Sequence, residues 1–283
     1  MLSTERVPLF IPRRIKQPSI IAATNDVLEP VPFKVSVVIP ALNEQKNLVY
    51  VLPKIPNWVG EVLLVDGHST DGTIAEARRL RPDIRIIQQE GRGKGAALRT
   101  AFAAVTGDIV VMLDADGSTN PTEMPVFIGA LLSGADFAKG SRFMQGGGTA
   151  DMTLFRHLGH WGLLLLVRFL FGGHYTDLCY GYNAFWARVL PKLDLDADGF
   201  EIETLMNVRV LHHGLRVAEV PSFEAERVYG ESHLRAIPDG WRVLWTIIKE
   251  KFSHRRRQTQ YIRGLKPGHP VHLFRHGHHL KSK

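Results

Sequence analysis

Short apolar runs rich in β-branched residues recur along the first half of the chain, and polar loops separate them from stretches with helical spacing. The helical stretches are Thr73–Leu80 and the alanine-rich Lys94–Val105. This alternation predicts βαβ units and a parallel sheet that is open at its edges. The apolar runs are KVSVVIP (34–40), EVLLVDG (61–67), IRIIQQ (84–89) and DIVVMLDAD (108–116).

The second half of the chain has a less regular pattern. We expect a strand at 136–142, a glycine loop at 146–148, an apolar helix at 154–171 and a strand at 183–187. Five prolines interrupt the first 33 residues and exclude a long helix there. The predicted organisation is an extension at 1–33, one α/β catalytic domain at 34–240, and an amphipathic helix with a basic tail at 241–283.

The apolar segments are too short or too interrupted to indicate a membrane span or a secretion signal. The run from Trp161 to Gly172 falls short of the ~20 residues that cross a bilayer, and Arg168 lies inside it. The amino-terminal segment has no apolar core of signal-peptide length. A single cysteine, Cys179, excludes an intramolecular disulfide framework and favours a reducing compartment. We therefore expect a cytoplasmic protein.

The formal charge of +7 is concentrated at the carboxyl end. Residues 249–283 contain ten Lys and Arg, one acidic residue and six of the thirteen histidines, so the rest of the chain is weakly acidic. A nucleic-acid-binding function would account for the basic tail but for no other feature of the sequence. We therefore expect no nucleic-acid partner. Two interpretations of the tail remain, a solvated segment and an anchor to an anionic surface.

Acidic residues stand where the predicted strands end. Asp66 closes the second apolar run, while Asp114 and Asp116 follow the fourth. Ligands of open parallel sheets bind outside the carboxyl ends of the strands. Two carboxylates with this spacing can share a hard divalent cation, and Mg²⁺ or Mn²⁺ that bridges a diphosphate prefers oxygen ligands. The sequence therefore predicts a metal-dependent site at this edge.

Residues 35–240 resemble the family 2 glycosyltransferases with the GT-A fold, which is a Rossmann-like open mixed sheet flanked by helices. Within that family they are most similar to the branch of dolichol-phosphate-mannose synthases and other polyprenyl-phosphate glycosyltransferases. The blocks that carry the resemblance occur in the family's order: VSVVIPALNE (35–44), VDGHSTDGT (65–73), GRGKGAALRTAF (91–102), MLDADGS (112–118), KGSRF (139–143) and RVYGESHL (227–234).

The resemblance implies a donor site for a GDP- or UDP-linked hexose. In the family, the positions of Pro40, Asn43, Glu44 and Asp66 hold the nucleotide, and Asp114 lies near the nucleotide and the sugar. Asp116 would be the main protein ligand of Mg²⁺ or Mn²⁺. Ser118 stands where many relatives have Gln, and its hydroxyl would reach the metal directly or through water.

Two basic positions complete the implied donor site. The GRGKG block matches neither phosphate-loop fingerprint, so Lys94 is either a cation near the diphosphate or a structural residue at a helix start. Arg227 and Ser232 belong to an RxxGxS block that in the family folds over the donor diphosphate. A planar cation at Arg227 would stabilise charge on the departing nucleotide.

Two kinds of acceptor remain possible, a lipid monophosphate and a saccharide hydroxyl. A lipid monophosphate is already anionic and needs positive charge, which Arg142 would supply by the resemblance, with Arg156 as a second candidate. A saccharide hydroxyl of a cell-envelope polymer or exopolysaccharide needs a general base, and the candidates lie at 198–203. The leading hypothesis is inverting hexose transfer to polyprenyl phosphate at the cytoplasmic membrane face.

Three segments indicate a peripheral enzyme on an anionic membrane surface. The stretch 154–171 is very apolar for a surface helix, and Trp241–Phe252 places Trp241, Leu244, Trp245 and Ile248 at helical spacing. Either helix would equally suit burial against the domain. The basic tail would add about 1 kcal/mol for each Lys or Arg near anionic lipid.

Overall fold

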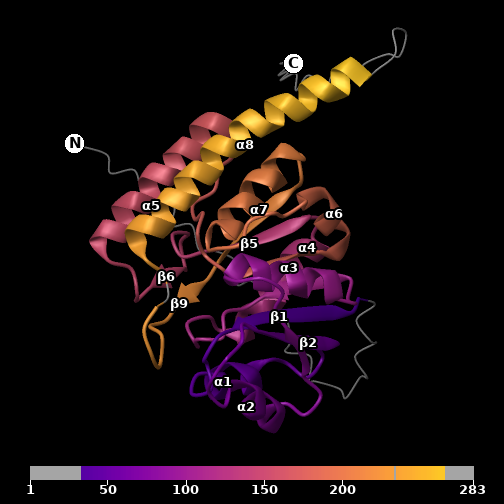
Figure 1. Ribbon diagram of the computed structural model, residues 1–283, viewed down its shortest axis with the longest axis vertical. Helices are drawn as coiled ribbons and strands as arrows, with labels where there is room; N and C mark the ends of the chain where they lie inside the picture. The colour runs from indigo at the N-terminus through magenta and orange to yellow at the C-terminus, as the bar shows by residue number, and fades with distance from the viewer. Residues whose placement is uncertain (1–32, 233, 265–283) are drawn as a thin grey trace, which may run out of the picture. The chain divides into compact units, whose positions relative to one another are not determined.

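A seven-stranded mixed sheet forms the centre of the protein (Figure 1). The computed structural model describes residues 33–232 and 234–264, with side chains described up to Ser253. The predicted amino-terminal extension up to residue 32 and the end of the basic tail lie outside this part. The strand order is β3-β2-β1-β4-β7-β5-β8. The strands are β1 Val35–Ala41, β2 Glu61–Asp66, β3 Arg85–Gln88, β4 Ile109–Met112, β5 Phe137–Ser141, β7 Asn183–Trp186 and β8 Val217–Pro221.

One strand of this sheet, β7, runs against the other six. Strands β1 to β4 pair in parallel, β7 runs antiparallel to both β4 and β5, and β5 pairs in parallel with β8. The predicted strands are therefore confirmed, and the sheet is mixed as the resemblance implies. A separate two-stranded ladder joins β6 (Gly148–Thr149) to β9 (Phe223–Glu224).

Both faces of the sheet are covered by helices, which explains the continuous apolar runs. In β1, Val37 and Ile39 pack into one core cluster with α1, α2 and α4, while Val38 packs into the other with α3, α6 and α7. The short helices η1 (Leu52–Lys54), η2 (Pro121–Glu123) and η4 (Ala187–Val189) connect these elements. The covering helices are α1 Leu48–Val51, α2 Thr73–Leu80, α3 Lys94–Ala104, α4 Met124–Leu132, α6 Leu190–Leu193 and α7 Glu201–His212.

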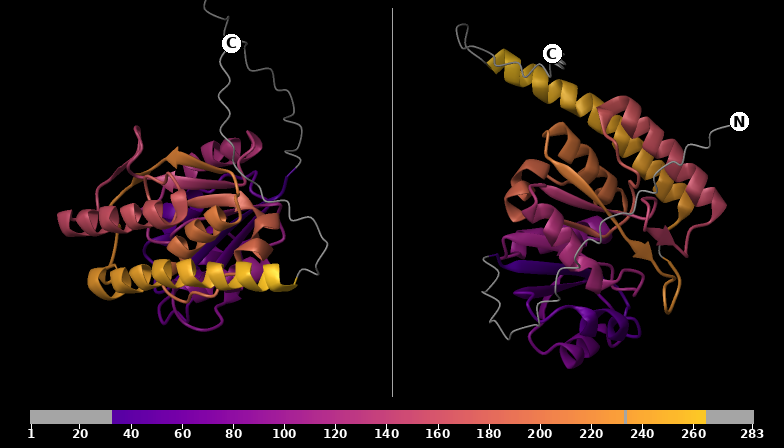
Figure 2. Two further views of the ribbon diagram at one scale, coloured as in Figure 1. Left: turned by 90° about the horizontal axis from the view of Figure 1, so that it is seen from above. Right: turned by 180° about the vertical axis from the view of Figure 1, so that it is seen from behind.

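Two long helices, α5 (Leu154–Val167) and α8 (Ala236–Gly264), lie side by side outside α7 (Figures 1 and 2). A third apolar cluster joins them, with Leu164 from α5, Val208 from α7 and Ile247 from α8. The side chain of Thr153 caps α5 by accepting from the backbone N–H of Arg156. A π-helical turn, Arg168–Gly172, extends α5.

The helices differ from the sequence expectations in length. The helix Leu154–Gly172 has 19 residues and a mean hydropathy of 1.2, so by length and composition alone it suffices to cross a membrane. From the shorter apolar run at 161–172, the sequence had predicted no segment long enough to cross a membrane. Helix α8 begins before Trp241 and continues to Gly264, so it crosses the predicted boundary at 240 and includes the first part of the basic tail.

Candidate active site

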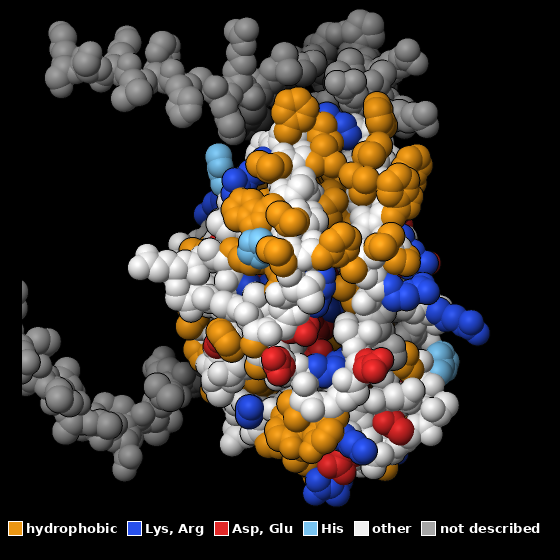
Figure 3. Space-filling view, turned by 90° about the vertical axis from the view of Figure 1, so that its left-hand side faces the viewer, with side chains coloured by type: hydrophobic (Ala, Val, Ile, Leu, Met, Phe, Trp, Pro, Cys, Tyr) orange, Lys and Arg blue, Asp and Glu red, His pale blue; other side chains and the backbone are white. Residues whose placement is uncertain are grey.

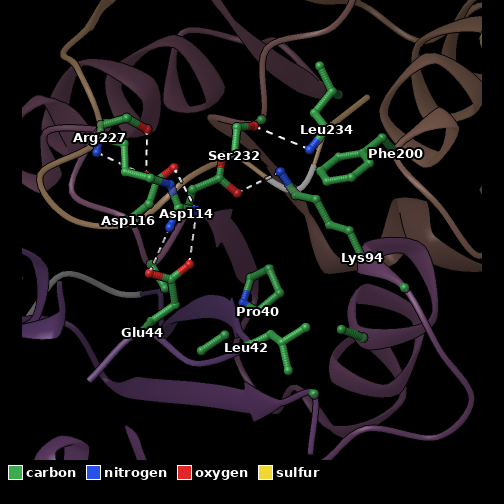
Figure 4. A pocket seen from close by; sticks show the side chains of 18 of the residues that line it. Pro40, Leu42, Glu44, Lys94, Asp114, Asp116, Phe200, Arg227, Ser232 and Leu234 are labelled. Atoms are coloured by element: carbon green, nitrogen blue, oxygen red, sulfur yellow. Dashed lines mark hydrogen bonds and ion pairs between the residues drawn. The ribbon is translucent and has the colours of Figure 1, made fainter. Parts of the chain in front are cut away.

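A cavity of about 790 Å³ opens at the carboxyl ends of β1, β2 and β4. This is the position expected for a ligand site in an open α/β sheet. Figure 4 shows side chains from distant parts of the chain pointing toward one another in it. The predicted site residues that line the cavity are Pro40, Glu44, Lys94, Asp114, Asp116, Ser118, Arg142, Arg227 and Ser232.

Asn43 and Asp66 do not line the cavity. The carboxylate of Asp66 is buried and accepts from the backbone N–H groups of His68 and Ser69 and from Gln88. Asn43 has a φ of 57°, and its side-chain oxygen accepts from the backbone N–H of Thr70. Both side chains therefore fix the turn after β2, which brings Gly67 and His68 to the cavity in their place.

Lys94 links two carboxylates at the cavity wall. Its Nζ lies 2.6 Å from Oδ1 of Asp114 and 2.7 Å from Oε1 of Glu203. Burial alone would lower the pKa of Lys94, but the two negative charges outweigh burial and raise it, so the ammonium stays charged. Burial raises the pKa of Glu203, which the charge of Lys94 opposes and that of Asp114 reinforces. The result is a charged cluster at the cavity wall whose carboxylate oxygens can accept from hydroxyl groups of a ligand.

Asp116 keeps one carboxylate oxygen turned to the cavity. Its Oδ1 accepts from the backbone N–H and the hydroxyl of Ser118, whereas Oδ2 lies 3.5 Å from Nη2 of Arg227. Ser118 is thus engaged by Asp116. Within the described residues, no three His, Cys, Asp or Glu side chains converge as a metal site. A cation shared with a diphosphate needs only one or two protein carboxylates, so the donor set fits Mg²⁺ or Mn²⁺ bound together with a nucleotide.

Arg227 pairs with Glu44 across the cavity. Its Nη2 lies 3.0 Å from Oε1 of Glu44. Arg227 lies on the segment between β9 and α8, which we call the arm. The arm is held at the start of α1, because Asn47 exchanges hydrogen bonds with the backbone N–H and carbonyl of Tyr229. Burial raises the pKa of Glu44, while hydrogen bonds from Asn47 and the charge of Arg227 lower it. A diphosphate that binds Arg227 must therefore compete with Glu44.

Ser232 lies farther along the same arm. Its hydroxyl accepts from the backbone N–H of Leu234, and both residues line the cavity. His233, the residue between them, lies outside the described part of the chain.

Arg142 is buried in a network of carboxylates. Its Nε and Nη2 donate to both oxygens of Asp177 at 2.7 and 3.0 Å, and its Nη1 donates to Glu224 at 3.0 Å. Burial opposes these charges, yet the pKa of Arg142 is raised and that of Asp177 lowered, so the pair stays ionised. Glu224 also accepts from Thr149 within the β6–β9 ladder, so Arg142 joins the end of β5 to that ladder. Arg142 therefore organises the cavity wall, and its contact with an acceptor stays a prediction.

Arg156, on α5, is the more accessible cation on this side. Its Nη1 donates to the carbonyl and carboxylate of Asp151 at 3.0 and 3.2 Å, and its side chain is 26% exposed. Arg92 also lines the cavity, from the loop before α3.

The sequence indicated some of these partners only in part. Glu203 lies in the 198–203 segment that was proposed to contain a base, but its pairing with Lys94 was not predicted. Asp177 and Glu224 gave no motif signal, because their roles come from long-range contacts with Arg142. A buried arginine needs anionic partners, but the sequence around Arg142 does not specify which distant acidic residues supply them.

Comparison with known proteins gives the family. Residues 36–193 match the model of glycosyl transferase family 2. The undecaprenyl-phosphate mannosyltransferase of Micrococcus luteus is 33% identical over 213 residues, which cover 71% of this chain and 87% of that protein. The polyprenol monophosphomannose synthase of Mycolicibacterium smegmatis is 33% identical over 211 residues, covering 70% and 80%.

A solved structure supports the same assignment. Glucosyl-3-phosphoglycerate synthase from Mycobacterium tuberculosis, in complex with Mn²⁺, UDP-glucose and phosphoglyceric acid, matches with a TM-score of 0.64 and 26% identity. The match covers 78% of this chain and 80% of that one. The GT-A fold is confirmed by this likeness and by the mixed seven-stranded sheet. With its cavity at the strand ends and its family match over residues 36–193, this chain is a glycosyltransferase and belongs to glycosyl transferase family 2.

Proposed function

We propose that this enzyme transfers a hexose from a GDP- or UDP-activated donor to a polyprenyl monophosphate, with inversion at the anomeric carbon. It would act as a peripheral enzyme on the cytoplasmic face of the cell membrane. The similarity to two enzymes named for polyprenyl-phosphate mannosyl transfer supports the acceptor class. The observation that carries the proposal is an apolar surface beside a charged cavity.

This surface, which we call the apolar ridge, consists of exposed side chains on α5, its π-helical turn and α8. Figure 3 shows apolar side chains gathered on one face of the protein, with acidic and basic side chains beside them. Large exposed apolar areas mark interaction sites in soluble proteins. Its members are Leu154, Phe155, Leu158, Leu165, Phe169, Ile237, Trp241, Trp245 and Phe252.

The cavity extends to α5, which carries four of the nine residues of this ridge. Arg156 of α5 lines the cavity, and the neighbouring Phe155 and Leu158 are each 64% exposed. A polyprenyl phosphate has an apolar chain and an anionic head. An apolar surface next to a cavity with arginines suits both parts of that molecule.

On the donor side, Arg227 would exchange Glu44 for the diphosphate and stabilise charge on the leaving nucleotide. Mg²⁺ or Mn²⁺, held by Asp116 together with the diphosphate, would supply further positive charge there. Asp114 and Glu203, fixed by Lys94, would accept from hexose hydroxyls. On the acceptor side, a phosphate monoester is already ionised, so Arg156 and Arg142 have to position it without a general base.

A saccharide hydroxyl is the second candidate acceptor, and Glu203 favours it. This carboxylate lies in the cavity with a raised pKa, as suits a general base. Its contact with Lys94 equally suits a role in fixing the donor site.

Vesicle co-sedimentation combined with turnover tests the lipid acceptor. We expect Phe169→Ser and Trp241→Ser to fold, because these side chains are 85% and 68% exposed. Each should weaken binding to anionic vesicles at least roughly tenfold, since burial of a large apolar side chain is worth about 1.5–3 kcal/mol. Turnover of long-chain polyprenyl phosphate in vesicles should fall in parallel, and that of a water-soluble short-chain analogue should not.

Trp58→Ser is the matched control, because Trp58 is 45% exposed but lies outside α5 and α8. It should bind vesicles as the wild type does. The proposal fails if wild-type protein does not bind anionic vesicles at low salt and a soluble saccharide is turned over faster than polyprenyl phosphate. A protein shortened after Gly264 shows whether the end of the basic tail contributes.

A further inference from the structure

A buried arginine outside the active-site cavity connects three separate segments. Arg209, on α7, is 2% exposed and donates to both carboxylate oxygens of Glu250 on α8, at 3.2 and 2.8 Å. It also donates to the carbonyls of Leu193 and Asp194 and, at 2.7 Å, to the carboxylate of Asp196. A buried guanidinium needs such partners because an unpaired buried charge is costly. Arg209 therefore ties the segment 193–196 to α7 and α8.

The continuation of this segment packs on the amino terminus of α3. The carbonyl of Asp198 accepts from the backbone N–H groups of Gly95 and Ala96, at 2.8 and 3.2 Å. A Cβ at Gly93 would lie 2.4 Å from the oxygen of Asp198, and a Cβ at Gly95 would lie 2.4 Å from that of Ala197. The glycines of the GRGKG block thus permit close approach of another backbone segment, and two N–H groups of the helix terminus are already used.

The same contact fixes Lys94, the first residue of α3. Lys94 holds Asp114 and Glu203 at the cavity wall. Segment 193–198 therefore connects Arg209, and through it the buried Glu250, to the start of α3.

We propose that the Arg209–Glu250 ion pair is a positioning device for the active site. Glu250 fixes Arg209, Arg209 fixes segment 193–198, and this segment fixes Lys94 and with it Asp114 and Glu203. Glu250 belongs to α8, so the helix that carries part of the apolar ridge also holds the donor-side cluster in place. The role concerns the donor side and is independent of the acceptor.

Hydrogen exchange tests, without any substrate, whether the Arg209–Glu250 pair holds segment 193–198 against the start of α3. Glu250→Gln removes the charge and keeps the side-chain size, and the backbone amides of Gly95 and Ala96 should then exchange roughly tenfold faster. Lys249→Ala is the matched control. Lys249 contacts the same Asp196 at 3.5 Å but is largely exposed, so exchange at both amides should stay at the wild-type rate. Unchanged exchange in a folded Glu250→Gln protein would overturn the proposal.

A double-mutant cycle tests whether Glu250 affects catalysis through Lys94. Glu250→Gln alone should lower kcat roughly tenfold or more with a smaller change in donor KM, because small displacements of catalytic groups are costly. In a Lys94→Met background it should have no further effect, since the displaced group is already absent. Multiplied losses in the double variant would overturn the proposal, because they would show that Glu250 does not act through Lys94.

Asp196→Ala provides a second route if Glu250→Gln does not fold. It removes one contact of the segment with Arg209 and leaves the buried Arg209–Glu250 pair intact. The same two readouts should change in the same direction by a smaller factor, and wild-type values in both would reject the proposal. If polyprenyl phosphate proves not to be the acceptor, hydrogen exchange still decides this inference.

Discussion

The proposed donor side and the proposed acceptor side of the cavity are built in different ways. On the donor side, Asp116 and Asp66 receive hydrogen bonds from residues two or three positions away, at the turns that follow β4 and β2. On the acceptor side, Arg142 contacts partners that are 35 and 82 positions away. Asp116 and Asp66 are therefore oriented largely by local turns, whereas Arg142 depends on the packing of the second half of the fold. Substitutions should separate the two.

The largest effect is expected at Asp116. Asp116→Asn removes the charge that faces the cavity and keeps the side-chain volume, so transfer should fall at least roughly a thousandfold, about 4 kcal/mol. The melting temperature should change little, because the side chain is only partly buried and the bonds to Ser118 can persist. Steady-state kinetics and calorimetric unfolding measure the two quantities. Excess chelator should abolish wild-type transfer as well, and full activity under chelation would contradict metal dependence.

Substitution of Arg142, unlike that of Asp116, should lower the stability of the fold. Arg142→Ala removes the main partner of the buried Asp177 carboxylate, so the free energy of unfolding should fall by about 3 kcal/mol or more. Arg156→Ala, at a more exposed pair, should change stability by less than about 1 kcal/mol and raise the KM for the acceptor. Chemical denaturation of both variants gives the comparison. Equal stability of the two variants would contradict a structural role for the Arg142–Asp177 pair.

The same buried pair predicts sensitivity to acid. The pKa of Asp177 lies below its ordinary value of 3.8, although burial opposes this shift, because Arg142 and Lys139 favour the carboxylate. The stability that this group contributes is present above pH 3.8 and is lost as the pH falls below it. Asp177→Asn should remove this part of the pH dependence below pH 3.8. An unchanged acid-unfolding profile would reject the assignment.

Smaller effects are expected in donor binding. Glu44→Gln and Asp66→Asn should each weaken nucleotide-sugar binding roughly tenfold to a hundredfold, about 1.5–3 kcal/mol for a charged hydrogen bond. The reasons differ, because Glu44 lines the cavity and Asp66 shapes the turn that brings His68 to it. Calorimetric titration measures both, with Glu76→Gln on α2 as a surface control. Unchanged affinity in both variants would exclude these roles.

The sequence was most informative where structure is local. Strands β1 to β4 and helix Thr73–Leu80 follow from apolar periodicity, and Asp114 and Asp116 follow from their place after a strand. Asn43 and Asp66 were assigned to the nucleotide because their positions match a family motif. Their hydrogen bonds to the neighbouring turn became visible only in three dimensions.

Contacts between residues far apart in the sequence could not be predicted, for a physical reason. The pairing of Lys94 with Glu203 joins residues on α3 and α7, and nothing in either local pattern specifies the partner. Helix α8 was predicted too short because the basic stretch after Phe252 has no apolar periodicity, although arginine and glutamine have high helix propensity.

The central claim is that the donor-side cluster and the apolar ridge serve one reaction, hexose transfer to a lipid phosphate. The most direct test incubates wild-type enzyme and Mn²⁺ with a panel of GDP- and UDP-sugars and polyprenyl phosphate in anionic vesicles, followed by mass analysis of the lipid. The expected product is a polyprenyl phosphate heavier by one hexose residue, absent with Asp116→Asn. Transfer of the hexose to a soluble saccharide, with the lipid unchanged for every donor, would contradict the account.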